Sequence, residues 1–419
     1  MIEYKKAQKI LSSSKIKIKN EIIFSKNSLN RVSAKNIFSP ANYPACNNTA
    51  FDGYAVNSRE TVGLTNNKKK KFKILKTIAA GDNPKIKNVK KFSSVEIMTG
   101  ALIPKHFDTV IPIEKIEYYP NKKNPKFILI GKKITKNNHV RFEGSDYKKG
   151  EKIVSAGEII SSSHILAFKS LGVERIVVKK KPKIVFYSTG NEISERNNIP
   201  DWKVRNSNSH YIKSLSNNLF FEIIDGGILR DKDDKLFKKL ISKNFKSKND
   251  IIITNGAVSA GKFDFVPRII KNFKLSNHFK GVAIRPGKPI MFAKFNDKNQ
   301  SFFGLPGNPI SSAACFKFFV YPYLRLILGM KKERSFKAKL KNTYSKKKNF
   351  TRFLKSKVVI NKKGTLEVEV LKGQESFRIK SFTKSNAWTL FKSGKSTFKK
   401  GQLIECFNHL GVQQKLYQK

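Results

Sequence analysis

The spacing of apolar residues changes along this chain of 419 residues, and each change indicates a different kind of structure. Apolar positions at helical spacing over Tyr4–Leu11 predict a short amphipathic helix near the start of the chain. A helical pattern returns in residues 145–178, where Ser161–Ser163 can cap a helix over Ile165–Leu171. We therefore expect residues 1–40 and 145–178 to form one linker domain.

Residues 41–144 and 329–419 have the pattern of strands instead. Short apolar runs alternate there with clusters of Gly, Pro, Asn and Lys, which is typical of β-rich domains. The strands predicted in the first stretch are Phe72–Ile78, Val95–Met98, Thr109–Ile113 and Phe127–Ile130. Lys357–Ile360 and Leu366–Val370 are examples from the second. The sequence thus predicts a β-rich insert domain and a small C-terminal β domain.

Strands and helices alternate regularly in residues 179–328, which favours an α/β domain whose parallel sheet lies between two helical layers. The predicted strands are Ile184–Tyr187, Phe221–Leu229, Asp250–Thr254, Val282–Ile284, Pro289–Lys294 and Phe302–Leu305. The predicted helices are Ser207–Leu219, Asp233–Phe245, Phe263–Phe273 and the long apolar Asn308–Leu328. The whole chain is expected to be an α/β multidomain protein.

The composition changes this picture only slightly. A formal net charge of +55 could indicate a nucleic-acid or membrane partner. The basic residues are dispersed, however, and accompany abundant Asn, Ile and Phe, so we interpret the charge mainly as compositional bias and expect no specific nucleic acid and no membrane. The chain has no run of 18 apolar residues and no signal-peptide core, which predicts a cytoplasmic protein. Its three scattered cysteines and six histidines indicate neither disulfides nor zinc.

Acidic residues at strand ends are the first candidates for chemistry. Glu192, Asp231 and Asp264 each follow a predicted strand of the α/β domain. Ligands of open α/β sheets bind beyond the carboxyl ends of the strands, so the three acids could converge on a hard cation such as Mg²⁺. Taken singly, each is more often a helix cap or a solvated residue.

Two glycine-rich turns, Asn255–Asp264 and Pro306–Ser311, are the second candidate. Glycine lets the backbone approach a ligand closely, and the helix that follows each turn offers free N–H groups to an anion. Both could also be ordinary turns. Lys280, Arg285 and Lys288 lie in a nearby basic segment and could hold a phosphate or oxyanion, although general basicity is an alternative explanation.

Together these segments resemble the molybdopterin molybdenumtransferase family, which includes the MoeA proteins and the gephyrin E domain. Each motif alone is weak, whereas the ordered set runs through almost the whole chain and is highly specific. The matching segments are Asn48–Val56, Ile97–Ala101, Arg141–Asp146, Ser188–Glu192, Asn206–Ser209, Arg230–Asp231, Asn255–Asp264, Arg285–Pro289 and Gly304–Ser311.

The resemblance implies a reaction and an assembly. Members of this family insert molybdate into adenylylated molybdopterin and release AMP, with a divalent cation that is usually Mg²⁺. The resemblance implies a three-layer, doubly wound α/β molybdopterin-binding domain and a C-terminal β-barrel domain beside the insert and linker domains. It also implies an elongated homodimer whose active site lies between the α/β domain of one subunit and the insert of the other, and a contact with the molybdopterin adenylyltransferase.

The resemblance also assigns roles by matched positions. The catalytic residues would be Asp52, Thr99, Asp146, Glu192, Asp231 and Asp264, of which Glu192, Asp231 and Asp264 would hold the metal. Substrate and phosphate would be bound by Gly256, Ser259, Gly261, Lys280, Arg285, Lys288, Pro306, Gly307, Asn308 and Ser311, and, with weaker local similarity, by Arg352 and Ser376.

Several positions depart from the family pattern. Ala257 replaces a glycine and adds a Cβ where glycine allows a positive φ or close ligand approach. Lys262 replaces a common acid and adds positive charge beside Asp264, which would favour phosphate over the cation. The other departures are Phe51 for Met, Asn191 for an acid and Asn255 for Ser.

Two other functions share parts of this pattern. The single-domain enzymes that adenylylate molybdopterin share the α/β domain, but the insert and the C-terminal domain argue against that activity. A non-catalytic scaffold of the same fold is the second alternative. The acids at Asp52, Asp231 and Asp264 favour catalysis.

Overall fold

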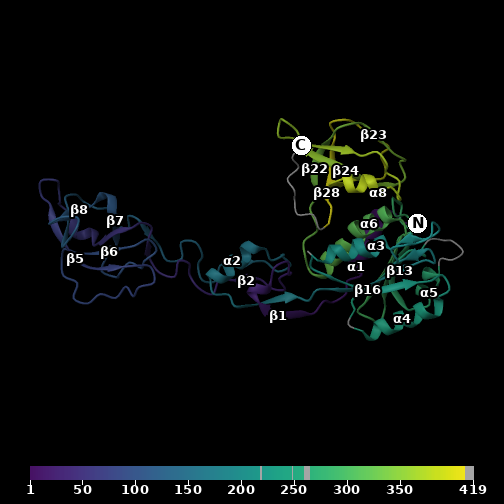
Figure 1. Ribbon diagram of the computed structural model, residues 1–419, viewed down its shortest axis with the longest axis horizontal. Coiled ribbons are helices and arrows are strands. Elements are labelled where there is room, and N and C mark those ends of the chain that lie inside the picture. Colours follow the sequence, from purple (N-terminus) through teal and green to yellow (C-terminus); the bar gives the residue numbers. More distant parts are fainter. Residues whose placement is uncertain (218, 248, 259–264, 411–419) are drawn as a thin grey trace.

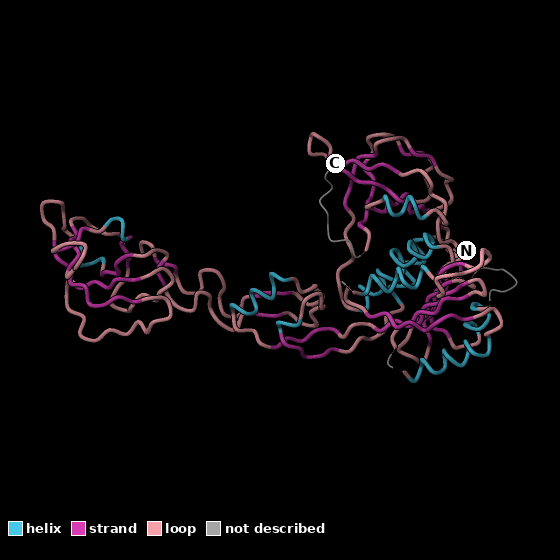
Figure 2. Tube along the Cα trace, in the orientation of Figure 1, coloured by secondary structure: helices cyan, strands magenta, loops and turns pink. Residues whose placement is uncertain are grey.

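The computed structural model describes residues 1–217, 219–247, 249–258 and 265–410, which form an elongated molecule (Figure 1). A β-rich unit lies at one end and a small unit containing α2 lies in the middle. The α/β unit and the C-terminal unit lie beside each other at the opposite end, as the distribution of strands and helices in Figure 2 also shows. Among the described residues, no helix is long and apolar enough to span a membrane.

The β-rich unit is a six-stranded sheet whose order is β7-β4-β6-β5-β9-β8. The predicted strands are confirmed as β5 (Lys70–Ile78), β6 (Ser93–Ile97), β7 (Thr109–Pro112) and β9 (Phe127–Ile130). The short strands β4 (Gly53–Val56) and β8 (Glu117–Tyr119) complete the sheet. Two apolar clusters, one containing Tyr54 and Phe72 and the other Val95, form its core.

The middle unit joins two distant parts of the chain. Strand β1 (Asn20–Phe24) pairs antiparallel with β12 (Arg175–Lys179), and β2 (Ile37–Phe38) pairs with β11 (Lys152–Val154). Helix α2 (Ser162–Ser170) begins as expected, because the Ser161 hydroxyl accepts a hydrogen bond from the backbone of His164 at 3.4 Å.

The α/β unit contains a six-stranded sheet ordered β16-β13-β17-β21-β20-β18. The strands are β13 (Lys183–Thr189), β16 (Glu222–Leu229), β17 (Ile251–Asn255), β18 (Leu275–Lys280), β20 (Met291–Phe295) and β21 (Ser301–Leu305). The sheet is mixed rather than parallel throughout, because β18 and β20 run antiparallel to their neighbours. Those two strands follow one another closely, so they are joined without the helical crossover that a parallel pair requires.

Helices cover both faces of this sheet, as predicted. Alternate residues of β13 point to opposite faces, with Ile184 in one apolar cluster and Val185 in the other. The first face is covered by α1 (Tyr4–Ser13), α3 (Ser207–Ser216), α6 (Pro309–Cys315) and α7 (Tyr321–Ile327). The second is covered by α4 (Asp234–Lys246) and α5 (Val266–Lys271).

Two predicted elements differ in the structure. The long helix over Asn308–Leu328 is interrupted by a π-helical turn at Phe316–Val320. Pro322 has no N–H to donate to the carbonyl of Phe318, and the side chain of Gln8 donates to that carbonyl instead at 2.8 Å. The predicted strand Val282–Ile284 is wrong as a member of the α/β sheet, because β19 (Ile284–Arg285) pairs with β24 of the C-terminal unit.

The C-terminal unit is a closed five-stranded barrel. Its strands are β22 (Phe336–Leu340), β24 (Thr351–Ile360), β25 (Leu366–Val370), β26 (Ala387–Phe391) and β28 (Leu403–Asn408), and the pairing of β24 with β26 closes the ring. Helix α8 (Ile379–Lys384) lies against the α/β unit, where the ring centroids of Phe382 and Tyr211 are 5.8 Å apart.

Candidate functional site

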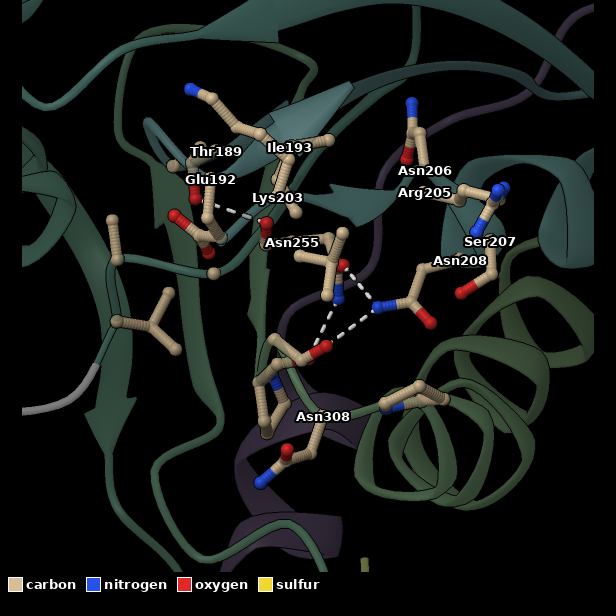
Figure 3. A pocket seen from close by; sticks show the side chains of 18 of the residues that line it. Thr189, Glu192, Ile193, Lys203, Arg205, Asn206, Ser207, Asn208, Asn255 and Asn308 are labelled. Atoms are coloured by element: carbon tan, nitrogen blue, oxygen red, sulfur yellow. Dashed lines mark hydrogen bonds between the residues drawn. The ribbon is translucent and has the colours of Figure 1, made fainter. Parts of the chain in front are cut away.

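A cavity of about 950 Å³ opens beyond the carboxyl ends of the adjacent strands β13, β17 and β21 (Figure 3). We call it the α/β pocket. Both acids that the sequence places after described strands, Glu192 and Asp231, line it. So do Gly256 and Gly307 from the two glycine-rich turns. The sheet therefore brings these predicted residues together, as the position of ligands in open α/β sheets requires.

Asn255, the last residue of β17, joins the two turns. Its side-chain amide donates to the carbonyl of Pro306 at 2.7 Å and to the hydroxyl of Ser312 at 2.9 Å. Its side-chain oxygen accepts from Asn208 at 2.6 Å, and the same nitrogen of Asn208 donates to the carbonyl of Gly307 at 2.7 Å. Asn255, one of the departures noted in the sequence, thus fixes the spacing of the turns over the pocket floor.

Gly256 and Ala257 both have positive φ angles, of 101° and 51°. At Gly256 an added Cβ would lie 2.5 Å from the hydroxyl oxygen and 2.7 Å from the backbone oxygen of Thr189. Gly256 is therefore required for its positive φ and for its close approach to Thr189. Ala257 adopts a left-handed conformation that glycine favours, so the expected strain of this departure is present in the backbone.

Two variants, Gly256→Ala and Ala257→Gly, test whether glycine is required at position 256 but not at position 257. Gly256→Ala is expected to lower the free energy of unfolding by about 1–3 kcal/mol, because the new methyl group must displace backbone atoms of Thr189. Ala257→Gly is expected to change it by less than about 1 kcal/mol, since relief of strain offsets the added flexibility of the unfolded chain. Thermal unfolding of both variants measures the effect. Equal stability of the two variants would contradict the assignment.

The acids are held by a loop that Arg230 fixes in place. Its guanidinium donates to the carbonyls of Gly190 at 3.0 Å and Ile193 at 2.9 Å. Asn191, one of the departures, accepts a hydrogen bond from the backbone of Asp231 at 3.2 Å. An amide can thus replace the usual acid here as a structural link between the two loops that carry Glu192 and Asp231.

Polar residues at and just before the start of α3 also line the pocket, and we did not predict them as site residues. Lys203, Arg205, Asn206 and Asn208 all face it (Figure 3). Behind them, Glu195 accepts hydrogen bonds from Asn206 and His210, and the bond from Asn206 is the main reason why the pKa of Glu195 is lowered. The motif Asn206–Ser209, noted only for its resemblance, was the available signal.

The predicted basic residues are not among the residues that line the α/β pocket, and two of them lie where β19 meets the C-terminal barrel. Arg285 and Arg352 are register partners in the parallel pair β19–β24, so two guanidinium groups emerge from neighbouring strands. The Arg285 guanidinium lies over the ring of Phe350. The Nε of Arg352 is buried without a hydrogen-bond partner in the described part of the chain. An unpartnered buried donor next to a second arginine fits an anion. Lys280 and Lys288, which flank β19 in sequence, are exposed.

The remaining candidates near the pocket come from α6 and the barrel. Asn308 precedes α6 and lines the pocket together with Pro306. Ser311 is buried in the first turn of this helix. The backbone carbonyl of Ser376 accepts from the N–H of Ile310 at 3.2 Å, so the barrel contacts the same helical turn.

Three candidates lie far from the α/β pocket within one chain. Asp52 accepts two hydrogen bonds from Thr99, from its backbone N–H at 2.6 Å and its hydroxyl at 2.8 Å, and these bonds lower the pKa of the carboxyl group. Both residues belong to the β-rich unit at the other end of the molecule (Figure 1). Asp146 lines a separate cavity between this unit and the middle unit.

Asp264, Ser259 and Gly261, together with the departure Lys262, lie outside the described residues. Within the described ranges, no group of three or more His, Cys, Asp or Glu side chains is placed to hold a metal ion. Glu192 and Asp231 are the two acids of the pocket lining. Mg²⁺ beside phosphates often takes only one or two carboxylates and completes its shell with water and phosphate oxygens, so this donor set fits such an ion.

Comparison with known proteins adds three family models that match consecutive parts of the chain. The MoeA N-terminal region (domain I and II) matches residues 2–172. A probable molybdopterin binding domain matches residues 186–326, and the MoeA C-terminal region (domain IV) matches residues 337–407. The matches therefore include the β-rich unit and the barrel as well as the α/β unit.

Similar proteins agree over nearly the full length. A molybdopterin molybdenumtransferase of Staphylococcus aureus (strain COL) is 30% identical over 383 residues, which cover 90% of this chain and 88% of that protein. One of Staphylococcus epidermidis (strain ATCC 12228 / FDA PCI 1200) is 28% identical over 408 residues, covering 96% and 94%. The crystal structure of a molybdopterin biosynthesis MoeA protein from Pyrococcus horikosii superposes with a TM-score of 0.82 at 27% identity, covering 98% and 100% of the two chains.

Proposed function

This chain belongs to the molybdopterin molybdenumtransferase (MoeA) family, and we propose that its α/β pocket binds adenylylated molybdopterin during the insertion of molybdate. The chain is a transferase of molybdenum cofactor biosynthesis. Adenylyltransferase activity is not favoured, because the matches extend over the β-rich unit and the barrel. The observation that carries the proposal is the convergence of two acids and two glycine-containing turns on one cavity at the carboxyl ends of β13, β17 and β21.

In this proposal the pocket holds the phosphates while the chemistry occurs on the pterin. Gly256, Gly307 and Asn308 present backbone to the phosphoanhydride. Glu192 and Asp231 would hold Mg²⁺, which would neutralise phosphate charge, and Asp264 would complete the set. The dithiolene sulfurs bond to molybdenum as oxo groups of molybdate leave with protons as water, and a water molecule cleaves the phosphoanhydride to release AMP.

The basic residues are proposed to hold molybdate and the phosphates. Arg352 and Arg285 offer neighbouring guanidinium groups, and the buried Nε–H of Arg352 has no hydrogen-bond partner among the described residues. Lys280, Lys288, Ser311 and Ser376 would complete the anion site, and Ser259 and Gly261 the phosphate turn. We further propose a homodimer in which Asp52, Thr99 and Asp146 of one subunit reach the pocket of the other, and a contact with the molybdopterin adenylyltransferase.

The test is to incubate the purified protein with adenylylated molybdopterin, Mg²⁺ and molybdate and to measure AMP. We expect release that depends on molybdate. A parallel reaction with molybdopterin, ATP and Mg²⁺ should give no adenylylated product. Product in the second reaction, or no AMP in the first from correctly folded protein, would overturn the proposal.

A further inference from the structure

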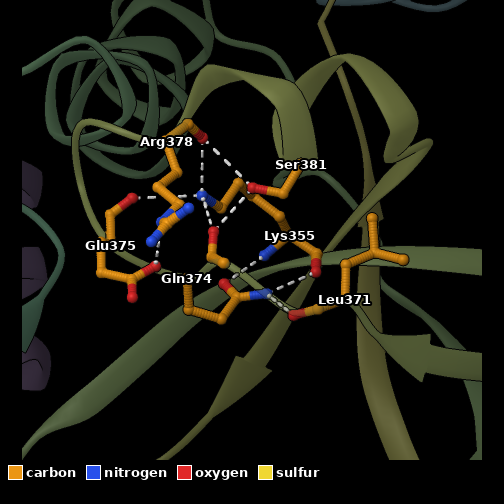
Figure 4. Close-up of polar contacts among 7 residues, drawn as sticks. Lys355, Leu371, Gln374, Glu375, Arg378 and Ser381 are labelled. Atoms are coloured by element: carbon orange, nitrogen blue, oxygen red, sulfur yellow. Dashed lines mark hydrogen bonds and ion pairs between the residues drawn. The ribbon is translucent and has the colours of Figure 1, made fainter.

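Lys355 is a lysine of the barrel strand β24 whose side chain is fully buried (Figure 4). Its ammonium donates to three backbone carbonyls, those of Gly373 at 2.6 Å, Arg378 at 3.0 Å and Glu375 at 3.2 Å. Burial lowers the pKa of Lys355 to about 8, because the charged form loses its water. The three carbonyls replace that hydration, and all three belong to the loop of residues 371–378 between β25 and α8.

The same loop is tied to the backbone of Lys355 through Gln374. The side-chain oxygen of Gln374 accepts from the N–H of Lys355 at 3.0 Å, and its nitrogen donates to the carbonyl of Lys355 at 2.8 Å. From the other side, the hydroxyl of Ser381 in α8 donates to the carbonyls of Gly373 at 2.6 Å and Arg378 at 3.2 Å. Figure 4 shows these contacts converging on the loop from the strand and from the helix.

This loop is also the part of the barrel that reaches the α/β pocket. The carbonyl of Ser376 accepts from the N–H of Ile310 in the first turn of α6. Ile379, the first residue of α8, lines the pocket itself and is 59% exposed. The shape of residues 371–378 therefore helps to set how the barrel meets the pocket.

We propose that Lys355 is a positioning residue for the reaction, and that its ammonium holds the loop of residues 371–378 in the form that presents Ser376 and Ile379 to the substrate. This inference rests on the proposed function of the α/β pocket. A lysine that merely completed the barrel core would be expected to contact carbonyls of several strands, whereas all three acceptors here lie in one loop. The carboxylate of Glu375 pairs with Arg378 at 3.2 Å, and the contact between Glu375 and the ammonium of Lys355 is made by the backbone carbonyl.

The first experiment compares Lys355→Met with Lys357→Met, an exposed lysine two residues along the same strand. In Lys355→Met, amide exchange in residues 371–378 and in the first turn of α6 is expected to become about tenfold faster or more, while β24 and β26 stay protected. The KM for adenylylated molybdopterin is expected to rise about tenfold with kcat nearly unchanged, since ground-state positioning is lost. Lys357→Met should match the unchanged protein. Unchanged exchange in the loop of Lys355→Met, or a uniform loss of protection over the barrel, would overturn the proposal.

The second experiment asks whether the ammonium itself matters. Lys355→Ala removes three methylene groups and the ammonium, and n-propylammonium replaces them in size and charge. Added n-propylammonium is expected to restore exchange protection of the loop, and n-propanol is not. Equal effects of the two compounds would refute a role for the charge. If Lys355→Met fails to fold, Lys355→Gln keeps a polar group in this buried position but removes the charge, and unchanged loop exchange in that folded variant would also overturn the proposal.

The two readouts separate this inference from the function on which it rests. Exchange and its rescue are measured without substrate, so they decide the role of Lys355 in holding the loop. Absence of molybdate-dependent AMP release from the unchanged protein would instead refute the function of the pocket.

Discussion

Asp231→Asn is expected to lower molybdate-dependent AMP release by about 10²–10³-fold, with a folded protein remaining. Asp231 and Glu192 line the α/β pocket as its described acids. The substitution keeps the shape of the side chain but removes the charge that would hold the cation. It leaves the local backbone fixed, because the N–H of Asp231 donates to Asn191 rather than depending on its own carboxylate.

The measurement is the rate of AMP release over a range of Mg²⁺ concentrations. A residue that holds the cation should also shift the Mg²⁺ concentration for half-maximal rate upward. The matched control is Asp225→Asn, an exposed acid of β16, the strand that precedes Asp231; its carboxylate accepts a hydrogen bond from the N–H of Gly227. Near-normal turnover of Asp231→Asn, or an equal loss in Asp225→Asn, would remove Asp231 from the site.

The sequence was sufficient to predict Asp231 as a site residue, because its position depends on where the preceding strand ends. The buried run before Thr189 and the strand before Arg230 define where β13 and β16 end, and the carboxyl ends of neighbouring parallel strands meet at one edge. Glu192 and Asp231 were therefore predictable without knowledge of packing. The described residues of the two glycine-rich turns, 255–258 and 306–311, were predictable for the same reason.

Contacts between units were less predictable. The strand at Ile284–Arg285 looks like its neighbours in the α/β sheet, but it pairs with the barrel, and periodicity holds no information about which distant strand is its partner. Lys355 is one of 85 basic residues, and nothing in its local sequence separates it from the exposed ones. Its role depends on the loop of residues 371–378, which is fixed by tertiary contacts.

Neutral polar residues were missed for a related reason. Asn206 and Asn208 lie at the start of a helix, where Asn and Ser are common simply as caps. In the structure Asn208 instead donates to Asn255 across the pocket floor. Asn206 donates to Glu195 and accepts from the hydroxyl of Ser188 at 2.7 Å. Only the spatial arrangement distinguishes such a network from an ordinary cap.

The second large effect is a recovery of AMP release, which we expect when two inactive variants are mixed. Asp52 lies in the β-rich unit, far from the α/β pocket of its own chain (Figure 1). Its carboxylate is held by Thr99 with a lowered pKa, so it is ionised at neutral pH and available at the surface. Asp52→Ala alone is expected to lower AMP release by about 10²-fold or more if this acid serves the pocket of a second subunit.

Mixing Asp52→Ala with Asp231→Asn then tests the arrangement directly. In a mixed dimer, one pocket combines the intact α/β unit of the first variant with the intact β-rich unit of the second, while the other pocket carries both substitutions. Random reassociation of equal amounts makes about half of the dimers mixed, so about one quarter of the original activity should return. Sites confined to one chain would give no recovery. A mixture of Asp231→Asn with Glu192→Gln is the control, because both substitutions affect the same α/β unit and every pocket stays defective.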